Sequence, residues 1–216
     1  IEDSVVYILQ TRSAKRTAQA SVKIAVDMHN ENLLTKEEAI NMVDANQITS
    51  VLHPQFKESS ERELFEKGLN ASPGAAVGVI VFDPDTAELE AQKGRKVILV
   101  RDETSPEDIH GMFSSVGILT TKGGMTSHAA VVARGMGKPC VAGAEKLIID
   151  YKNKTISNSS LTLEEGDLIS IDGSTGEIFV GEIEMESAAL SDEFNTLMTW
   201  CDEYKKFSIR ANAETV

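Results

Sequence analysis

Hydrophobic spacing divides the chain into a helical part and a strand-rich part. Over residues 13–56, apolar side chains recur every three or four positions, which is the spacing of amphipathic helices. Ser13 is suited to cap the first helix, and Thr35 with Glu38 forms a capping box for the second. A third short helix is expected from Asp44. The pattern therefore predicts a helical block without catalytic residues.

From residue 68 onward, the pattern changes to short apolar runs separated by glycine, proline and aspartate, as in strands bounded by turns. Alternation on either side of residues 172–176 predicts a hairpin with Asp172 at its turn. A helix is expected from Pro106, with Asp108 completing its cap. Strands are expected at residues 72–82, 96–101, 117–121, 139–143, 146–150 and 164–180, and a further helix at 87–92. The pattern predicts an α/β domain with three layers, β/β/α, between helical linker segments.

The two ends of the chain each add one predicted strand. Residues 4–12 are an apolar run that ends in polar side chains, and residues 207–213 form the second apolar run. Between this second strand and the domain, residues 191–204 have the spacing of an amphipathic helix. Its apolar face is expected to carry Phe194, Leu197, Met198, Cys201 and Tyr204. The chain starts without Met and stops inside a predicted strand, so we expect it to be a fragment of a longer enzyme.

A glycine-rich turn between a predicted strand and a predicted helix carries the most informative histidine. Gly123 and Gly124 follow the apolar run 117–121, and their lack of a Cβ lets backbone approach a ligand closely. Thr126 and Ser127 are both good N-caps. His128 is therefore expected in the first turn of a helix.

That position favours one kind of chemistry. The first N–H groups of a helix are unpaired and, together with the helix dipole, attract anions and disfavour a cationic imidazole. We expect His128 to be a neutral nucleophile that accepts a phosphoryl group. A metal site is less suited, because no second His, Cys or carboxylate lies at ligand spacing. The alternative is a histidine that only packs at a helix start.

The charge and composition of the chain exclude some classes of binding partner. The chain has 21 Lys and Arg against 34 Asp and Glu, for a formal net charge of −13. This acidity argues against binding nucleic acid or an anionic membrane through a broad basic surface. Cys140 and Cys201 have no motif spacing and fit reduced thiols in a cytosol-like compartment.

The run from Gly123 to Arg134 resembles the phosphohistidine signature of the phosphoenolpyruvate-utilising enzymes at all twelve positions. The resemblance implies that His128 is the phosphorylated residue and that residues 68–185 form the swivelling phosphohistidine domain. The supporting, phosphate-binding residues expected around it are Gly123, Gly124, Thr126, Ser127, Lys122, Thr104 and Arg134.

The flanking segments resemble parts of the neighbouring domains of this family. Residues 1–12 resemble the closing strand of an ATP-grasp nucleotide domain, in which Gln10 and Arg12 would face ATP phosphates; the alternative is an ordinary surface strand end. Residues 207–216 resemble the first strand of a TIM-type barrel that binds pyruvate and phosphoenolpyruvate, where Arg210 would contact substrate. Residues 13–67 and 186–206 would be linkers.

The order of these segments, together with the runs 103–108 and 123–137, looks most like the pyruvate phosphate dikinases. The implied reaction converts ATP, phosphate and pyruvate into AMP, diphosphate and phosphoenolpyruvate, which the fragment alone would not turn over. The resemblance also implies Mg²⁺ held by the flanking domains, a homodimer formed through the barrel, and a cytoplasmic or organellar location. In plant members the threonine at the position of Thr126 is phosphorylated to switch the enzyme off. The alternatives are a phosphoenolpyruvate synthase and a non-catalytic phosphocarrier or regulatory domain.

Overall fold

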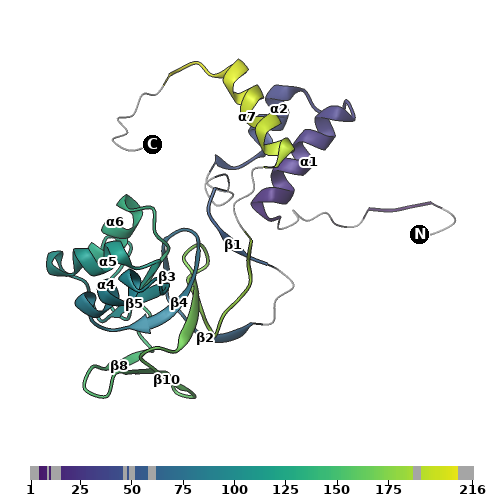
Figure 1. The fold of residues 1–216 in the computed structure, drawn as a ribbon. Helices are drawn as coiled ribbons and strands as arrows, with labels where there is room; N and C mark the ends of the chain where they lie inside the picture. The colour runs from purple at the N-terminus through teal and green to yellow at the C-terminus, as the bar shows by residue number, and fades with distance from the viewer. Residues whose placement is uncertain are drawn as a thin grey trace. The chain divides into compact units, whose positions relative to one another are not determined.

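The computed structural model describes residues 5–8, 10, 16–45, 48, 52–57, 62–186 and 191–208, which belong to two compact units (Figure 1). The first unit spans residues 1–48 and 190–216, and the second spans residues 49–189. None of the helices in the described part of the chain is long and apolar enough to cross a lipid bilayer.

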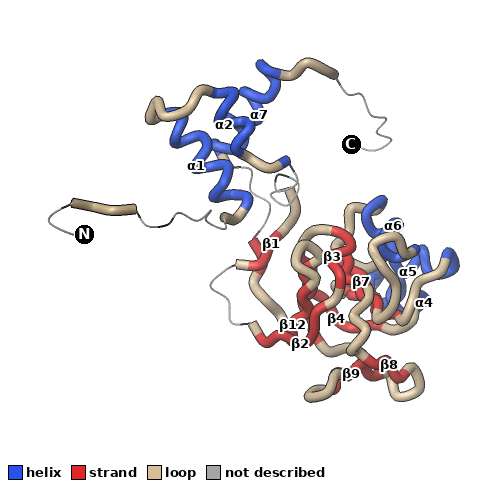
Figure 2. Tube along the Cα trace, turned by 180° about the vertical axis from the view of Figure 1, so that it is seen from behind, coloured by secondary structure: helices blue, strands red, loops and turns tan. Residues whose placement is uncertain are grey.

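Three helices with described bounds pack together in the first unit and are coloured blue in Figure 2. They are α1 (Ala18–Asn30), α2 (Lys36–Met42) and α7 (Asp192–Tyr204). The edge of the His29 ring meets Trp200, with the ring centroids 4.6 Å apart, and His29 Nδ1 lies 3.0 Å from the carbonyl oxygen of Leu34. His29 is therefore a packing residue, in agreement with the sequence.

Three predictions for this unit can be compared with the structure. The capping box of Thr35 and Glu38 is confirmed. The cap at Ser13 is wrong, because α1 begins at Ala18 and Thr17 accepts a hydrogen bond from the Ala20 N–H. The proposed apolar face of α7 needs correction, since Trp200 is buried and Tyr204, the last residue of the helix, is 46 % exposed.

The second unit is built on an eight-stranded mixed sheet. Its strand order is β2-β12-β11-β4-β5-β6-β7-β3, and β4 to β7 run parallel to one another. The strands are β2 (Glu63–Lys67), β3 (Leu69–Ser72), β4 (Ala75–Val81), β5 (Val97–Arg101), β6 (Gly117–Thr120), β7 (Cys140–Ala142), β11 (Leu168–Asp172) and β12 (Glu177–Val180). Two smaller sheets pair β1 (Gln55–Phe56) with β13 (Met185–Glu186), and β8 (Ile148–Asp150), β9 (Thr155–Ser157) and β10 (Thr162–Glu164) with one another.

The parallel strands are joined by helices that all pack on one face of the sheet (Figure 1). These are α4 (Pro84–Gln92), the short 3-10 helix η1 (Pro106–Asp108) with α5 (Ile109–Ser114), and α6 (His128–Gly135). On this face Leu99 and Ile118 belong to the same buried cluster as Ala130 of α6. Short apolar strands buried on both faces are what a parallel arrangement requires.

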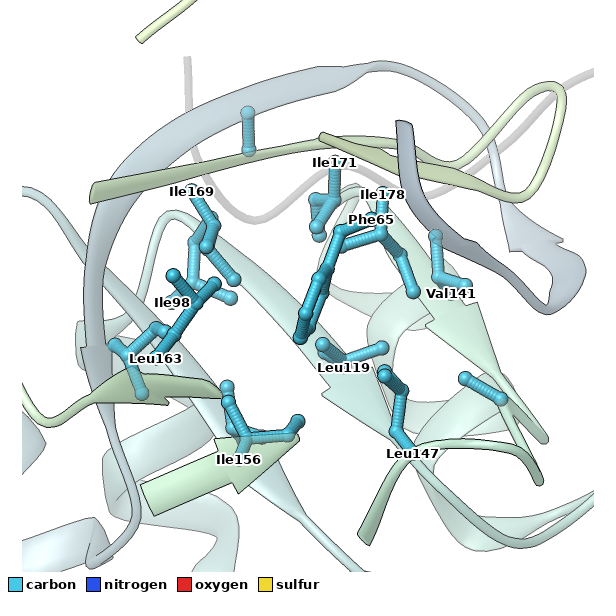
Figure 3. Packing of buried hydrophobic residues seen from close by; sticks show 14 of the residues in the cluster. Phe65, Ile98, Leu119, Val141, Leu147, Ile156, Leu163, Ile169, Ile171 and Ile178 are labelled. Atoms are coloured by element: carbon cyan, nitrogen blue, oxygen red, sulfur yellow. The ribbon is translucent and has the colours of Figure 1, made fainter. Parts of the chain in front are cut away.

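The opposite face of the large sheet is covered by the three-stranded sheet. Ile156 and Leu163 of the small sheet join the same buried cluster as Ile98 and Leu119 of the large one (Figure 3). Phe65 of β2 completes this cluster and is 4 % exposed. Helices, large sheet and small sheet therefore form three layers, and the predicted β/β/α architecture is confirmed.

Some details differ from the sequence-based expectation. The run predicted as one strand over residues 72–82 is two strands, β3 and β4, which lie apart in the sheet order because Gly74 turns the chain with φ +112°. Strand β2 lies inside the range assigned to a helical linker, since Phe65 belongs to the sheet core. Strands β9 and β10 were not predicted.

Other predictions agree or cannot be compared. The hairpin of β11 and β12 and the turn role of Asp172 are confirmed, because its Oδ1 accepts from the Ser174 N–H at 2.8 Å. Of the strand predicted over residues 4–12, residues 5–8 and 10 are described, with Val5 as a single bridging position. Most of the third predicted helix and of the strand over residues 207–213 lies outside the described residues.

Candidate phosphohistidine site

The site lies where two neighbouring parallel strands end. Arg101 at the end of β5 is in register with Thr120 at the end of β6, so the loops that follow them leave the same edge of the sheet. The Thr121 N–H donates to the Arg101 carbonyl at 3.0 Å, and the Lys122 N–H donates to the Asp102 carbonyl at 2.9 Å. These bonds carry the strand pairing one step into the loops and bring residues 102–108 beside residues 121–127.

The glycine-rich loop leads directly into α6. Gly123 has φ +96°, a left-handed conformation that favours glycine. Ser127 is the N-cap of α6, and its Oγ accepts a hydrogen bond from the Ala130 N–H at 3.3 Å. A Cβ on Gly143 would come 2.5 Å from the Gly123 carbonyl oxygen, so the segment after β7 packs directly on the loop. The expected strand, turn and helix are all present.

His128 is the first residue of α6 and is partly buried. Its Nδ1 lies 2.9 Å from Thr104 Oγ1, which comes from the loop after β5. Within the described part of the chain, Nε2 has no hydrogen-bond partner. Thr104 therefore engages one ring nitrogen and leaves the other available.

A cavity of about 210 Å³ opens beside this histidine. It is lined by Glu103, Thr104, Thr120, Lys122, Gly123, Ser127, His128 and Ala129. Sites for drug-sized ligands commonly measure about 300 to 1,000 Å³, so this cavity suits a small group such as a phosphoryl group better than a whole nucleotide. Ser127 uses the Ala130 N–H, and the His128 and Ala129 N–H groups have no acceptor among the described residues.

Lys122 supplies the positive charge at the cavity. Its Nζ lies 3.4 Å from Asp102 Oδ2, and the lysine side chain is 61 % exposed. Asp102 is itself held by Thr121, whose hydroxyl donates to Oδ1 at 2.7 Å. A surface ion pair of this kind contributes about 0 to 1 kcal/mol, so Lys122 can exchange Asp102 for another anion at small cost.

Four of the expected supporting residues line the cavity with His128, and the other three do not. Thr104, Lys122, Gly123 and Ser127 line it. The Arg134 guanidinium instead donates to the backbone carbonyls of Ala130 and Met125 and so braces the loop before α6.

The remaining predicted residues are placed as follows. Thr126 is exposed, and its side chain makes no hydrogen bond to the described residues, so it is not the cap that the sequence also allowed. Gly124 has open space where a Cβ would stand. Gln10 is described and exposed, whereas Arg12 and Arg210 lie outside the described residues.

The sequence missed three residues at the cavity. Glu103 and Thr120 line it, and Asp102 pairs with Lys122. The sequence contains the signal for Asp102 and Glu103, since polar residues directly after a buried parallel strand often line a site at that edge. Thr120 is fully buried within an apolar strand, and its hydroxyl donates to the Lys122 carbonyl at 2.8 Å.

Cys140 is a second potential nucleophile, packed in the same buried cluster as residues of α6. It is fully buried, and this burial raises the pKa of the thiol to about 12, although Arg134 lowers it in part. A thiol with such a pKa is almost entirely protonated near neutral pH and is a poor nucleophile. His128 is therefore the better candidate.

Known proteins with similar sequences share one description and one name. Residues 93–176 match the family described as "PEP-utilising enzyme, mobile domain". Over these residues the chain is similar to the phosphoenolpyruvate-utilising enzymes. It is 53 % identical to a pyruvate, phosphate dikinase of Rhizobium meliloti, 52 % to one of Rickettsia bellii and 51 % to one of Giardia intestinalis. Each match covers 100 % of this chain and 24 % of the relative, so the chain spans about a quarter of these curated relatives.

Proposed function

We propose that this chain is the central, phosphoryl-carrying segment of a pyruvate, phosphate dikinase and that His128 carries the phosphoryl group. The whole enzyme would convert ATP, phosphate and pyruvate into AMP, diphosphate and phosphoenolpyruvate. The identity of about 50 % over the entire chain to enzymes of that name supports this reaction. Residues 68–185 would be the swivelling domain, and residues 1–12 and 207–216 would belong to the nucleotide domain and the barrel.

The observation that carries the proposal is the arrangement of His128. The hydrogen bond between Thr104 Oγ1 and Nδ1 suits a tautomer with the proton on Nδ1 and the lone pair on Nε2. Nε2 would attack the phosphorus atom of the donor, while the leaving oxygen takes the electron pair of the broken P–O bond. In the onward step the enolate oxygen of pyruvate would attack phosphorus, and the P–N bond would break toward Nε2.

The surroundings fit the charge that such a step creates. The free N–H groups of His128 and Ala129 lie at the start of α6, where an anion is favoured. Lys122 adds a cation at the cavity. Catalysis of phosphoryl transfer depends mainly on positioning and on charge stabilisation of this kind.

The Mg²⁺ that such enzymes use is not assigned to this chain. The described residues contain no group of three His, Cys, Asp or Glu side chains that could hold a metal ion. We therefore assign Mg²⁺, together with the binding of ATP and pyruvate, to the flanking domains of the full-length enzyme. The homodimer and the cytoplasmic or organellar location are proposals of the same kind.

The test is labelling of the full-length enzyme with radiolabelled phosphoenolpyruvate. We expect acid-labile, base-stable label that His128→Asn removes. The matched control is His110→Asn, because His110 does not line the cavity. The His110 side chain is 40 % exposed, and its Nε2 lies 2.9 Å from Asp85 Oδ1. Label that survives His128→Asn would refute the assignment.

A further inference from the structure

We propose that an ion pair between Arg101 and the buried Asp108 positions Thr104 against His128 and so sets which ring nitrogen is the nucleophile. This inference rests on the proposed function and deepens it. Neither residue lines the cavity, so both would be positioning residues that act through Thr104.

One carboxylate ties together both ends of the loop that carries Thr104. Arg101 Nη2 lies 3.4 Å from Asp108 Oδ1. The Ser105 N–H and hydroxyl donate to Asp108 Oδ2 at 2.7 and 3.2 Å. Only Asp102, Glu103 and Thr104 lie between these two anchors, and we call the set Arg101, Ser105 and Asp108 the carboxylate clasp.

The carboxylate at the centre of the clasp is buried, which makes it a strong constraint. The side chain of Asp108 is 5 % exposed and that of Arg101 is 28 % exposed. Removing one partner of a buried pair leaves an uncompensated charge, so the native geometry is preferred over loosened alternatives. Arg101 also donates from Nη1 to the Phe82 carbonyl at 3.1 Å, which fixes the guanidinium to the end of β4.

The guanidinium is not held in its own best hydrogen-bonding arrangement. Arg101 Nε is buried and has no partner among the described residues. An unsatisfied buried donor is rare and has a cost. We infer that Arg101 Nε is left unpaired because the guanidinium is directed toward Asp108 and the Phe82 carbonyl. In that position it holds the two ends of the loop together.

Tyr151 supports the same loop from the small sheet side. Its hydroxyl accepts a hydrogen bond from the Asp102 N–H at 2.8 Å, and its ring lies 5.6 Å from the Arg101 guanidinium carbon. Asp102 then engages Thr121 and Lys122 of the glycine-rich loop. The clasp thus holds both ends of the loop of Thr104, and Asp102 within that loop connects it to the loop of His128.

The simpler explanation is that Asp108 only caps the short helix η1. A capping role predicts a change in stability alone. A positioning role predicts, in addition, a change at the His128 ring and a dependence on Thr104. Ring-nitrogen NMR and a double-mutant cycle separate the two roles.

The first measurement uses NMR of the 216-residue chain with isotope-labelled histidine. The sequence contains 4 histidines, so the His128 signals can be assigned by substitution. We expect one dominant tautomer with the proton on Nδ1 in the wild type. Thr104→Val, Asp108→Asn and Arg101→Gln should each shift the His128 ring nitrogens toward a tautomer mixture.

The second measurement is the rate of His128 phosphorylation in the full-length enzyme. We expect Asp108→Asn and Arg101→Gln each to lower this rate by about 10-fold to 100-fold, as small misplacements of reacting groups do. In a Thr104→Val background, the same substitutions should have little further effect, because they act through Thr104.

The control is Asp172→Asn, which alters an aspartate that also accepts backbone N–H bonds but lies at the hairpin turn, opposite the start of β4. It should change neither the ring signals nor the rate. If Asp108→Asn does not fold, Arg101→Lys, which keeps the cation, replaces it and should give a smaller shift of the same kind.

The proposal is overturned if folded clasp variants leave the His128 ring signals unchanged, or if their effects on rate multiply with that of Thr104→Val. Failure of the proposed function has a different signature. In that case the wild-type enzyme acquires no label on His128, while the ring signals still report whether the clasp holds Thr104.

Discussion

Replacement of Ser127 by alanine tests the start of α6, on which the whole site depends. Ser127 Oγ accepts the Ala130 N–H, one of the donors that a helix start cannot satisfy internally. Loss of such a cap typically costs about 0.5 to 2 kcal/mol. The bond measures 3.3 Å, slightly beyond the usual range for N–H···O contacts, so we expect a cost of about 0.5 to 1 kcal/mol for Ser127→Ala.

The neighbouring threonine provides a matched control. Thr126 is exposed, and its side chain makes no hydrogen bond to the described residues. Thr126→Ala should therefore change the free energy of unfolding by less than about 0.5 kcal/mol. Ser127→Gly is a second control, since glycine at an N-cap costs only a few tenths of a kcal/mol.

Urea unfolding of the chain, followed by far-ultraviolet circular dichroism, gives these free energies directly. Thermal unfolding is an independent check, because about 1 kcal/mol corresponds to a fall in Tm of about 3 to 5 °C for a unit of this size. If Thr126→Ala is the more costly substitution, or if the two alanine variants are equally stable, then Ser127 is not the cap and our account of the first turn is wrong.

Two further predictions concern the same loop. Gly123→Ala should lower the free energy of unfolding in urea by about 1 to 3 kcal/mol, because the φ of Gly123 is +96° and a Cβ there would stand 2.9 Å from Ser127 Cβ. Gly124→Ala should lower it by less than about 0.5 kcal/mol, because the space at its Cβ position is open. Equal costs for the two variants would contradict the assigned backbone. Thr126→Asp should slow phosphorylation of His128 by about 10-fold at low ionic strength, with partial recovery at high salt, because a carboxylate beside the start of α6 competes with the incoming phosphate. Thr126→Asn, which has the same size without the charge, should remain close to wild type. An unchanged rate for Thr126→Asp would argue against control of the site by phosphorylation of Thr126.

The sequence predicted the elements whose signals are local. The capping box at Thr35, the hairpin turn at Asp172 and the strand, glycine turn and helix around His128 each depend on a few consecutive residues. In each case the side chain that bonds the backbone lies within three residues of its partner. Local signals of this kind survive in the folded chain because the tertiary structure agrees with them.

The elements that the sequence missed depend on distant partners. Strand β2 forms because Glu63 to Lys67 pair with β12, more than a hundred residues later, whereas the sequence alone assigned these residues to a linker. Trp200 is buried because α1 and α2 meet that face of α7, while Tyr204 at the helix end lies exposed. No local pattern of residues specifies which distant strand or helix will pack against a segment.

The same distinction explains why the histidine could be found from sequence while its orientation could not. The glycine loop and the helix start are consecutive in the chain, and they carry His128 and the unpaired N–H groups of the first helical turn. Thr104 is 24 residues earlier and meets His128 only because β5 and β6 are paired in a register that places Arg101 beside Thr120. A shift of that register by one residue would turn alternate side chains to the other face and separate the two groups. In our proposal, sheet pairing and the clasp that extends it into the loop after β5 together determine which nitrogen of His128 is free to react.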